Sequence, residues 1–347
     1  MQIKSLSIKN FKSIRQLEIQ NVESSLILVG KNNTGKTAVL DAIRTVTGEY
    51  EVHETDFNEK KQNIEIGMVL GITEEDLRQF HTYGLISGYK RYESWRNDFC
   101  EKLPSYGEGE LKFVCTINRN GKIRYDDGAH KDNRRIAEIL PKFHFIDAAR
   151  NLMSFQEDLL LFQNEEELVR LRENTCIFDE AKECNHCFSC IGLIHQKKPE
   201  ELQLHETARL LEYKMCQLNL TRFFERVSKN YRKNGGNEEI GYALYFNREQ
   251  MFRIGAEAWH EKQKRLSPVE DLGNGMRSIY MLSLLETYIE DEKRIPSIIV
   301  VEYPELFLHP SLQKTASKIL YRLSKKNQVI FTTHSPNMVA NFTKGQI

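Results

Sequence analysis

The stretch GKNNTGKT, residues 30–37, decides the fold class of this 347-residue chain. Its spacing, Gly-x-x-x-x-Gly-Lys-Thr, is that of a P-loop, whose glycines let successive backbone N–H groups point at phosphate oxygens. The apolar run LILV before it predicts a strand buried on both faces, and AVLDAIRTV after it predicts a helix that ends at Gly48. A chance glycine-rich turn is the alternative, and the flanking strand and helix argue against it.

The loop predicts a site for a nucleoside triphosphate with Mg²⁺. The Lys36 ammonium would reach the β- and γ-phosphates, and the Thr37 hydroxyl would bind Mg²⁺. The other loop residues would supply backbone N–H groups at the positive end of the following helix. The predicted nucleotide-contacting residues are Gly30, Lys31, Asn32, Asn33, Thr34, Gly35, Lys36 and Thr37.

The composition limits the classes of protein that the chain can belong to. Lys plus Arg and Asp plus Glu both total 49, so bulk charge gives no case for nucleic-acid binding, although a local basic face is possible. No apolar run is long enough to cross a membrane, and the N-terminus lacks the apolar block of a signal peptide. Seven cysteines, an odd number, argue against a disulfide framework. We therefore expect a cytoplasmic protein.

Strand and helix patterns alternate on both sides of a central region of different character. In that region, residues 154–174 and 206–233 place Leu among charged residues at helical spacing, which predicts an antiparallel helical arm. Predicted strands lie within residues 1–30, 63–70, 111–117, 143–150, 296–310 and 327–339. Alternating strands and helices favour an α/β sheet.

The pattern predicts three parts of the chain. Residues 1–150 and 236–347 would form one α/β head, and residues 151–235 would be the inserted arm. The chain stops at Ile347 where another strand should follow, so we expect a truncation before a C-terminal effector domain.

A cluster of cysteines lies between the two predicted arm helices. Cys176, Cys184, Cys187 and Cys190 have the spacing C-x7-C-x2-C-x2-C, with His186 and His195 nearby. Thiolates at two-residue spacing suit tetrahedral Zn²⁺, and the core of the run also resembles part of an iron–sulfur ligand set. Free thiols in a loop are the third alternative. The spacing favours a structural Zn²⁺ site at the tip of the arm, with an iron–sulfur cluster as the alternative.

Five segments occur in an order that is typical of one class of ATPase: MQIKSLSIKNFKSI at the N-terminus, GKNNTGKT, then DLGNGMRS, IIVVEYPELFLHP and FTTHSP. Together they resemble P-loop ATPases of the SMC/RecF/ABC class, which implies an ABC/SMC-type head. Within that class the chain is most similar to the ATPase domain of OLD-family proteins, which include Gabija-type and retron-associated anti-phage ATPases. The resemblance covers roughly residues 1–60 and 265–342.

The resemblance implies roles for residues far from the loop. Gly273, Asn274 and Gly275 stand at the signature turn, which would contact the γ-phosphate bound to a second copy. Glu302 takes the Walker B position and would hold Mg²⁺ through water. His334 takes the switch position, which senses the γ-phosphate. Taken alone, a glycine-containing turn is more often an ordinary loop, and a single histidine is more often structural.

The order Glu302-Tyr303-Pro304-Glu305 departs from the family pattern, which usually carries two acidic residues there. The second of them positions or deprotonates the attacking water. A phenol with a pKa of about 10 is a poor base at pH 7. Either Glu305 takes this role or hydrolysis is slow and ATP mainly holds a dimer closed; we expect the second. The candidate catalytic residues are Glu302, Glu305 and His334.

The resemblance also implies partners. It implies a homodimer or larger homo-oligomer that controls an effector nuclease in anti-phage defence, in cis beyond Ile347 or in trans. The alternatives are a RecF/SMC-like DNA-repair clamp and a non-hydrolysing nucleotide-dependent scaffold. DNA contact follows from the resemblance more than from the basic stretches at residues 89–96 and 229–233, for which a solvated charged face is the alternative.

Overall fold

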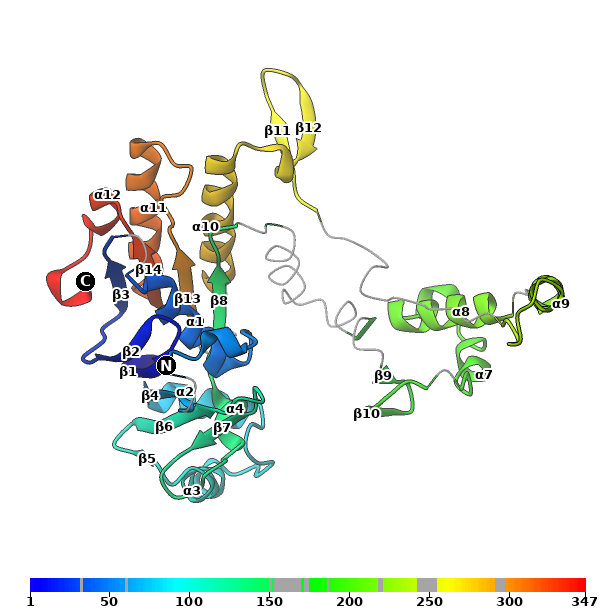
Figure 1. Ribbon diagram of the computed structural model, residues 1–347, viewed down its shortest axis with the longest axis horizontal. Coiled ribbons are helices and arrows are strands. Elements are labelled where there is room, and N and C mark those ends of the chain that lie inside the picture. The colour runs from blue at the N-terminus through cyan, green and yellow to red at the C-terminus, as the bar shows by residue number, and fades with distance from the viewer. Residues whose placement is uncertain are drawn as a thin grey trace. The chain divides into compact units, whose positions relative to one another are not determined.

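A computed structural model describes residues 1–31, 34–59, 62–149, 152, 170–171, 175–185, 187–217, 221–241, 255–290 and 297–347. The chain divides into two compact units (Figure 1). The first unit combines Met1–Phe155 with Glu257–Ile347, and the second is Gln156–Ala256. The first unit contains the P-loop together with Glu302, Tyr303, Glu305 and His334.

A parallel sheet forms the part of the first unit that carries the P-loop. Its strand order is β3-β14-β13-β8. The two central strands have apolar sequences, SIIVVE and QVIFTT, and are almost completely buried, as expected for strands that are covered on both faces. The bounds are β3 (Ser25–Val29), β8 (Lys142–Ile146), β13 (Ser297–Glu302) and β14 (Gln328–Thr333).

Helices accompany this sheet (Figure 1). They are α1 (Lys36–Thr47), α10 (Asn274–Glu290), α11 (Pro310–Leu323) and α12 (Pro336–Val339). Helix α1 follows β3 directly after the P-loop, and Gly48 ends it in the left-handed conformation with φ 79°, as the sequence predicts. Because all four strands are parallel, the segments that follow β3, β13 and β14 leave from the same edge of the sheet.

An antiparallel sheet packs beside it and shares its apolar core. The strands are β1 (Gln2–Phe11), β2 (Ile14–Ile19), β4 (Ile64–Gly71), β5 (Tyr106–Gly107), β6 (Glu110–Ile117) and β7 (Ile123–Asp126). Alternate residues of β4 and β6 are buried, which is the pattern of strands with one covered face. Helices α2 (Glu74–Thr82), α3 (Tyr92–Lys102) and α4 (Arg135–Ile139) complete this region, and the predicted strands at 63–70 and 111–117 are confirmed as β4 and β6.

One buried glutamine joins the two sheets. The side chain of Gln328, on β14, is fully buried. Its Oε1 accepts the backbone N–H of Ile3, and its Nε2 donates to the carbonyl oxygens of Ile3 and Glu23, each at 2.8 Å. The amide thereby fixes the start of β1 and the segment before β3 against the strand that leads to His334.

The remaining elements are divided between the two units. In the first unit they are β11 (Glu257–His260), β12 (Arg265–Pro268) and the short 3-10 helices η1 (Glu54–Asp56), η4 (Val269–Asp271) and η5 (Lys344–Gln346). In the second unit they are β9 (Thr175–Cys176), β10 (Asp179–Glu183), α7 (Ile191–Ile194), η2 (Pro199–Glu201), α8 (Leu204–Cys216) and α9 (Thr221–Lys233). The predicted helix at 206–233 is therefore two helices, and the one at 154–174 lies outside the described residues except at positions 170 and 171.

Candidate nucleotide-binding site

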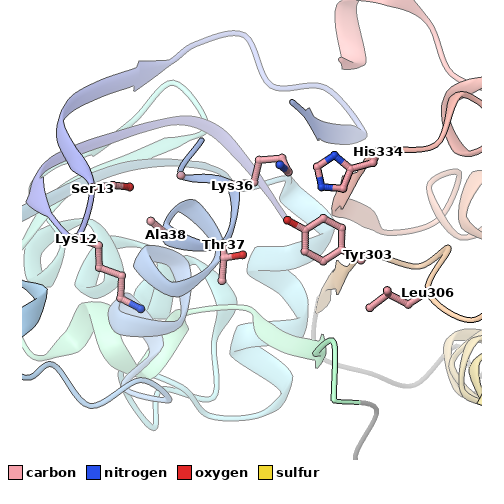
Figure 2. A pocket seen from close by; sticks show the side chains of 9 residues that line it. Lys12, Ser13, Lys36, Thr37, Ala38, Tyr303, Leu306 and His334 are labelled. Atoms are coloured by element: carbon pink, nitrogen blue, oxygen red, sulfur yellow. The ribbon is translucent and has the colours of Figure 1, made fainter. Parts of the chain in front are cut away.

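The edge of the parallel sheet carries a pocket of about 820 Å³. The segments that follow β1, β3, β13 and β14 all contribute to it (Figure 2). The residues that line it are Lys12, Ser13, Gly35, Lys36, Thr37, Ala38, Tyr303, Leu306 and His334. Four of these belong to the P-loop and the start of α1, and three come from the Walker B and switch segments that lie more than 260 residues away in the sequence.

Lys36 lies at the centre of the pocket wall and is only 6% exposed. Its ammonium donates to the carbonyl oxygens of Gly30, at 2.9 Å, and Lys31, at 2.6 Å. Burial lowers the pKa of Lys36, and the nearby negative charge of Glu305 acts in the opposite direction. Phosphate oxygens form stronger, charge-assisted bonds than carbonyls, so a phosphate group can replace these two partners.

Gly35 requires its special conformation at the point where the loop enters α1. Its φ is 92°, in the left-handed region, and an added Cβ would lie 3.2 Å from the Ser13 hydroxyl oxygen. The second glycine of the motif therefore allows both the turn and the close approach of β1–β2 residues to the loop.

Thr37 and Glu302 meet although 265 positions separate them in the chain. The Thr37 hydroxyl donates to the Glu302 carboxylate at 2.5 Å. Hydroxyl and carboxylate oxygens are the hard ligands that Mg²⁺ prefers in nucleotide sites. The two side chains thus form a donor set that fits the predicted magnesium ion.

Tyr303 and His334 form a stacked pair beside Lys36 (Figure 2). Their ring centroids are 5.0 Å apart with an angle of 12° between the planes, and the Lys36 ammonium lies 5.7 Å from the tyrosine ring centroid. Tyr303 has a left-handed backbone, with φ 45°, and its N–H donates to the Thr332 hydroxyl. This backbone turns the phenol toward Thr37.

The chemistry of the Tyr303 phenol follows from its surroundings. Burial raises the pKa of Tyr303, a hydrogen bond with Thr37 lowers it, and the negative charges of Glu302 and Glu305 raise it further. Because the result lies above the ordinary value near 10, the phenol is protonated at neutral pH and does not act as a base there.

The Glu305 carboxylate is engaged by the switch segment. One oxygen, Oε1, accepts the backbone N–H of His334 at 2.7 Å. The other, Oε2, is buried and has no hydrogen-bond partner among the residues that the structure describes. Glu305 is not one of the residues that line the pocket, whereas its neighbours Tyr303 and Leu306 are.

The signature residues are not brought to this pocket. Gly273 precedes α10, and Asn274 and Gly275 form its first turn. None of the three lines the pocket that contains Lys36. A Cβ at Gly275 would come within 2.8 Å of the Phe307 carbonyl oxygen, so this glycine lets the start of α10 pack directly on the backbone that follows the Walker B strand.

Some pocket residues had no predicted role. Lys12 and Ser13 lie in the N-terminal segment NFKSI, which the sequence marks as a motif without saying what it contacts. The Lys12 ammonium pairs with Asp41 on α1 at 2.6 Å and lies 4.3 Å from the Tyr50 ring centroid. The signal in the sequence that could have indicated their place in the pocket is a lysine followed by a serine at the end of a predicted strand. Asn32 and Asn33 of the predicted set lie outside the described residues.

The metal site predicted at the four cysteines of the arm finds no support in the described residues. Within the described residues, no three His, Cys, Asp or Glu side chains are arranged to hold a metal ion. Cys187 is exposed, whereas Cys190 is buried and packs with Ile191 and Ile194. Burial raises the pKa of the Cys190 thiol, whereas hydrogen bonds with Ser189 lower the pKa of the Cys187 thiol. The predicted neighbour His186 lies outside the described residues.

No helix in the described ranges combines the length and the apolar character needed to span a bilayer.

Two curated proteins resemble the chain along nearly its whole length. The OLD nuclease of Thermus scotoductus is 23% identical over 361 residues, which covers 96% of this chain and 59% of that protein. The Old nuclease of Escherichia phage P2 is 22% identical over 372 residues, which covers 98% of this chain and 57% of that protein. The chain thus spans somewhat less than three-fifths of the length of these relatives.

A solved structure supports the fold. The Smc head domain with an extended coiled coil from Pyrococcus furiosus, solved bound to the C-terminal domain of ScpA, has a TM-score of 0.51 and is 16% identical, with 98% of this chain and 91% of that chain covered. This likeness confirms the predicted ABC/SMC-type α/β head, while the predicted cysteine-rich tip has no such support.

A family model described as an AAA ATPase domain, AAA_15, matches residues 1–182 and 194–339. The match includes the P-loop, the Walker B strand and the switch histidine. The resemblance to OLD-family ATPases that the motifs indicated is confirmed by the two curated relatives. The chain therefore belongs to the AAA_15 family of AAA ATPase domains, resembles OLD nucleases in sequence and has the fold of an SMC head.

Proposed function

We propose that this ATPase domain binds MgATP, hydrolyses it slowly and closes with a second copy around the nucleotide in order to control a nuclease. The observation that carries the proposal is that Lys36, Thr37 and His334 line one pocket and that Thr37 bonds to Glu302 at the end of a third segment. An ordinary glycine-rich turn would not bring an acidic strand end and a histidine to its lysine.

The side chains of the pocket suit a polyphosphate. Lys36 would exchange its two carbonyl partners for phosphate oxygens. The N–H groups at the positive end of α1 would also donate to the phosphates. Thr37 and Glu302 would hold Mg²⁺, which neutralises charge on the phosphates when it is bound. His334 would meet the terminal phosphate from the far side of the pocket.

Slow hydrolysis follows from the groups that could activate water. The phenol of Tyr303 stays protonated at neutral pH because its pKa is raised, first of all by burial. The Glu305 carboxylate does not line the pocket. A positioned general base typically contributes 10²–10⁴-fold to rate, so a site without one should turn over slowly. If no turnover were measured at all, the non-hydrolysing scaffold would replace this proposal.

Dimerisation is proposed from the position of the signature turn. Gly273, Asn274 and Gly275 do not line the pocket of their own chain, so the nucleotide they would contact is that of a second copy. Gly273 offers a clean probe, because an added Cβ there meets no atom within 4 Å and its φ is not positive.

We expect that Glu302→Gln, which slows turnover, traps an ATP-dependent dimer. Adding Gly273→Glu to this variant should leave it monomeric at the same concentration, because the new carboxylate would face the γ-phosphate of the partner. The ATP affinity of the double variant should stay within about 3-fold of that of Glu302→Gln alone, since Gly273 is outside the pocket of its own chain. Sedimentation velocity with and without MgATP measures both states.

Gly88→Glu is the matched control, since Gly88 also has open space around it. It should dimerise like the parent. A parent that is dimeric without nucleotide, or one that binds ATP and stays monomeric, would contradict the proposed closure.

The effector is proposed to be a nuclease, either in the same protein beyond Ile347 or in a partner. The support is the name of the two curated relatives, both called nucleases, of which the chain covers less than three-fifths. An anti-phage role is part of this proposal, and phage plating on cells that carry the intact gene or its Lys36→Ala variant tests it. A RecF/SMC-like clamp would instead show DNA retention without cleavage.

Contact with DNA is proposed at one face of α9. This helix, TRFFERVSKNYRK, carries five cations and one anion in a chain whose net charge is zero. Arg226, Lys229 and Lys233 are exposed at positions i, i+3 and i+7, which share a face. The Ser228 hydroxyl exchanges hydrogen bonds with the backbone of Ile240 at 2.7 and 2.8 Å, so another face is turned inward. Phosphate backbones bind such exposed cations.

Replacing Arg226, Lys229 and Lys233 together by alanine should reduce the slope of log affinity against log salt by roughly three units, about one per lost phosphate contact. Fluorescence anisotropy with a labelled duplex between 50 and 200 mM KCl measures this slope. Lys318, Lys325 and Lys326, which are also exposed, form the control triple. An equal reduction in both variants would show that α9 has no special part in binding.

A further inference from the structure

Glu305 links two functional groups of the pocket without lining it. Its Oε1 accepts the backbone N–H of His334 at 2.7 Å, and its negative charge favours the charged form of Lys36. The same carboxylate follows Glu302 by three residues, on the loop that leaves β13. A single side chain therefore relates the Walker B loop, the switch histidine and the P-loop lysine.

We propose that Glu305 is a positioning residue for His334 and is not the general base that its place in the sequence suggests. The proposal rests on the nucleotide-binding function proposed above. It assigns the carboxylate the task of holding the switch loop at the pocket, so that the His334 ring can meet the terminal phosphate.

Geometry argues against a base. A general base must come within hydrogen-bond reach of the water from which it takes a proton. Glu305 does not line the pocket, its Oε2 is buried, and its Oε1 is engaged by a backbone N–H. One oxygen is therefore occupied by a backbone N–H and the other is shielded from solvent.

The contacts around His334 favour positioning. On one side, Glu305 holds the His334 N–H. On the other side, the hydroxyl of Ser335 donates to Gln313 on α11 at 2.8 Å and caps the first turn of α12. The ring itself stacks on Tyr303. The loop is thus fixed from both flanks, and removal of the Glu305 bond frees one of them.

The conservative variant separates the two roles. In Glu305→Gln the amide oxygen can still accept the His334 N–H, whereas a base is lost. We expect kcat of Glu305→Gln within about 3-fold of the parent. We expect Glu305→Ala to lose at least 10-fold in kcat and to reduce the preference for ATP over ADP, because His334 no longer meets the γ-phosphate.

A double variant identifies the route through which Glu305 acts. Glu305→Ala combined with His334→Ala should be no slower than His334→Ala alone, since both changes remove the same interaction. Glu261→Ala, at an exposed glutamate in the β11–β12 turn, is the control and should equal the parent. Steady-state hydrolysis and calorimetric Kd values for MgATP and MgADP supply the data.

Three outcomes overturn the proposal. A loss of about 100-fold or more in Glu305→Gln, with unchanged nucleotide affinity, would make the carboxylate the base. Full activity in Glu305→Ala would make the contact unimportant. Additive losses in the double variant would show that Glu305 does not act through His334. Each of these outcomes is measured against a parent that binds ATP. They can therefore be told apart from a failure of the parent to bind nucleotide, which would contradict the proposed function instead.

Discussion

Replacement of Tyr303 by glutamate is expected to raise the rate of ATP hydrolysis about 100-fold or more. The side chain at this position lines the pocket and lies beside Lys36 and Thr37, whereas the phenol that occupies it stays protonated. A carboxylate there could accept a proton from water, and base assistance is typically worth 10²–10⁴-fold. Tyr303 already has a left-handed backbone, and glutamate is not β-branched, so the fold should tolerate the change. Phosphate release under saturating MgATP measures the rate.

Tyr303→Phe is the matched variant for this experiment. It keeps the ring that stacks on His334 and removes only the hydroxyl. Its rate should stay within a few-fold of the slow parent. A large loss in Tyr303→Phe would show that the phenol takes part in the reaction. An unchanged rate in Tyr303→Glu would mean that the slow step does not depend on a base at this place.

Replacement of Lys36 by alanine is expected to weaken MgATP binding by at least about 100-fold, or about 2.7 kcal/mol. The ammonium is buried beside the loop, where its bonds with phosphate would be charge-assisted and shielded from water. Isothermal titration calorimetry gives the affinity directly. Hydrolysis and ATP-dependent dimerisation should be lost together, since both depend on the bound nucleotide.

Lys326→Ala is the control for lost positive charge, because Lys326 is exposed at the end of α11. It should bind MgATP like the parent. If folded Lys36→Ala binds MgATP with unchanged affinity, the P-loop is not the nucleotide site and the proposed function is wrong.

The sequence predicts the local parts of the head well because their signals are local. A buried strand, a glycine-rich turn and an amphipathic helix follow one another within residues 25–48, and each leaves its own pattern. The apolar runs of β13 and β14 are equally plain. Their places in the sheet depend on pairing between strands hundreds of residues apart, which no local pattern encodes and which only the family order of motifs suggests.

The sequence predicts the contacts within the site even less well than the order of the strands. Glu302 could be assigned to the end of a buried strand, but its 2.5 Å contact with Thr37 depends on how two strands are ordered. Glu305 carries the same residue type that a base requires, and only its burial and its bond with His334 distinguish the roles. The cysteine spacing predicts a metal site, but spacing alone does not reveal that Cys190 packs with Ile191 and Ile194.

The strand order of the parallel sheet has a consequence for how the protein is made. The early strands β3 and β8 are not neighbours, because the late strands β14 and β13 lie between them. On a ribosome that adds about 5–20 residues per second, β3 waits roughly 15–60 s for its partner to be synthesised. During that interval the nascent chain exposes unpaired apolar edges, which makes it a client for chaperones. Two separately expressed halves, cut within the arm, would each hold only two of the four strands of the parallel sheet, and they should become soluble only when they are produced together.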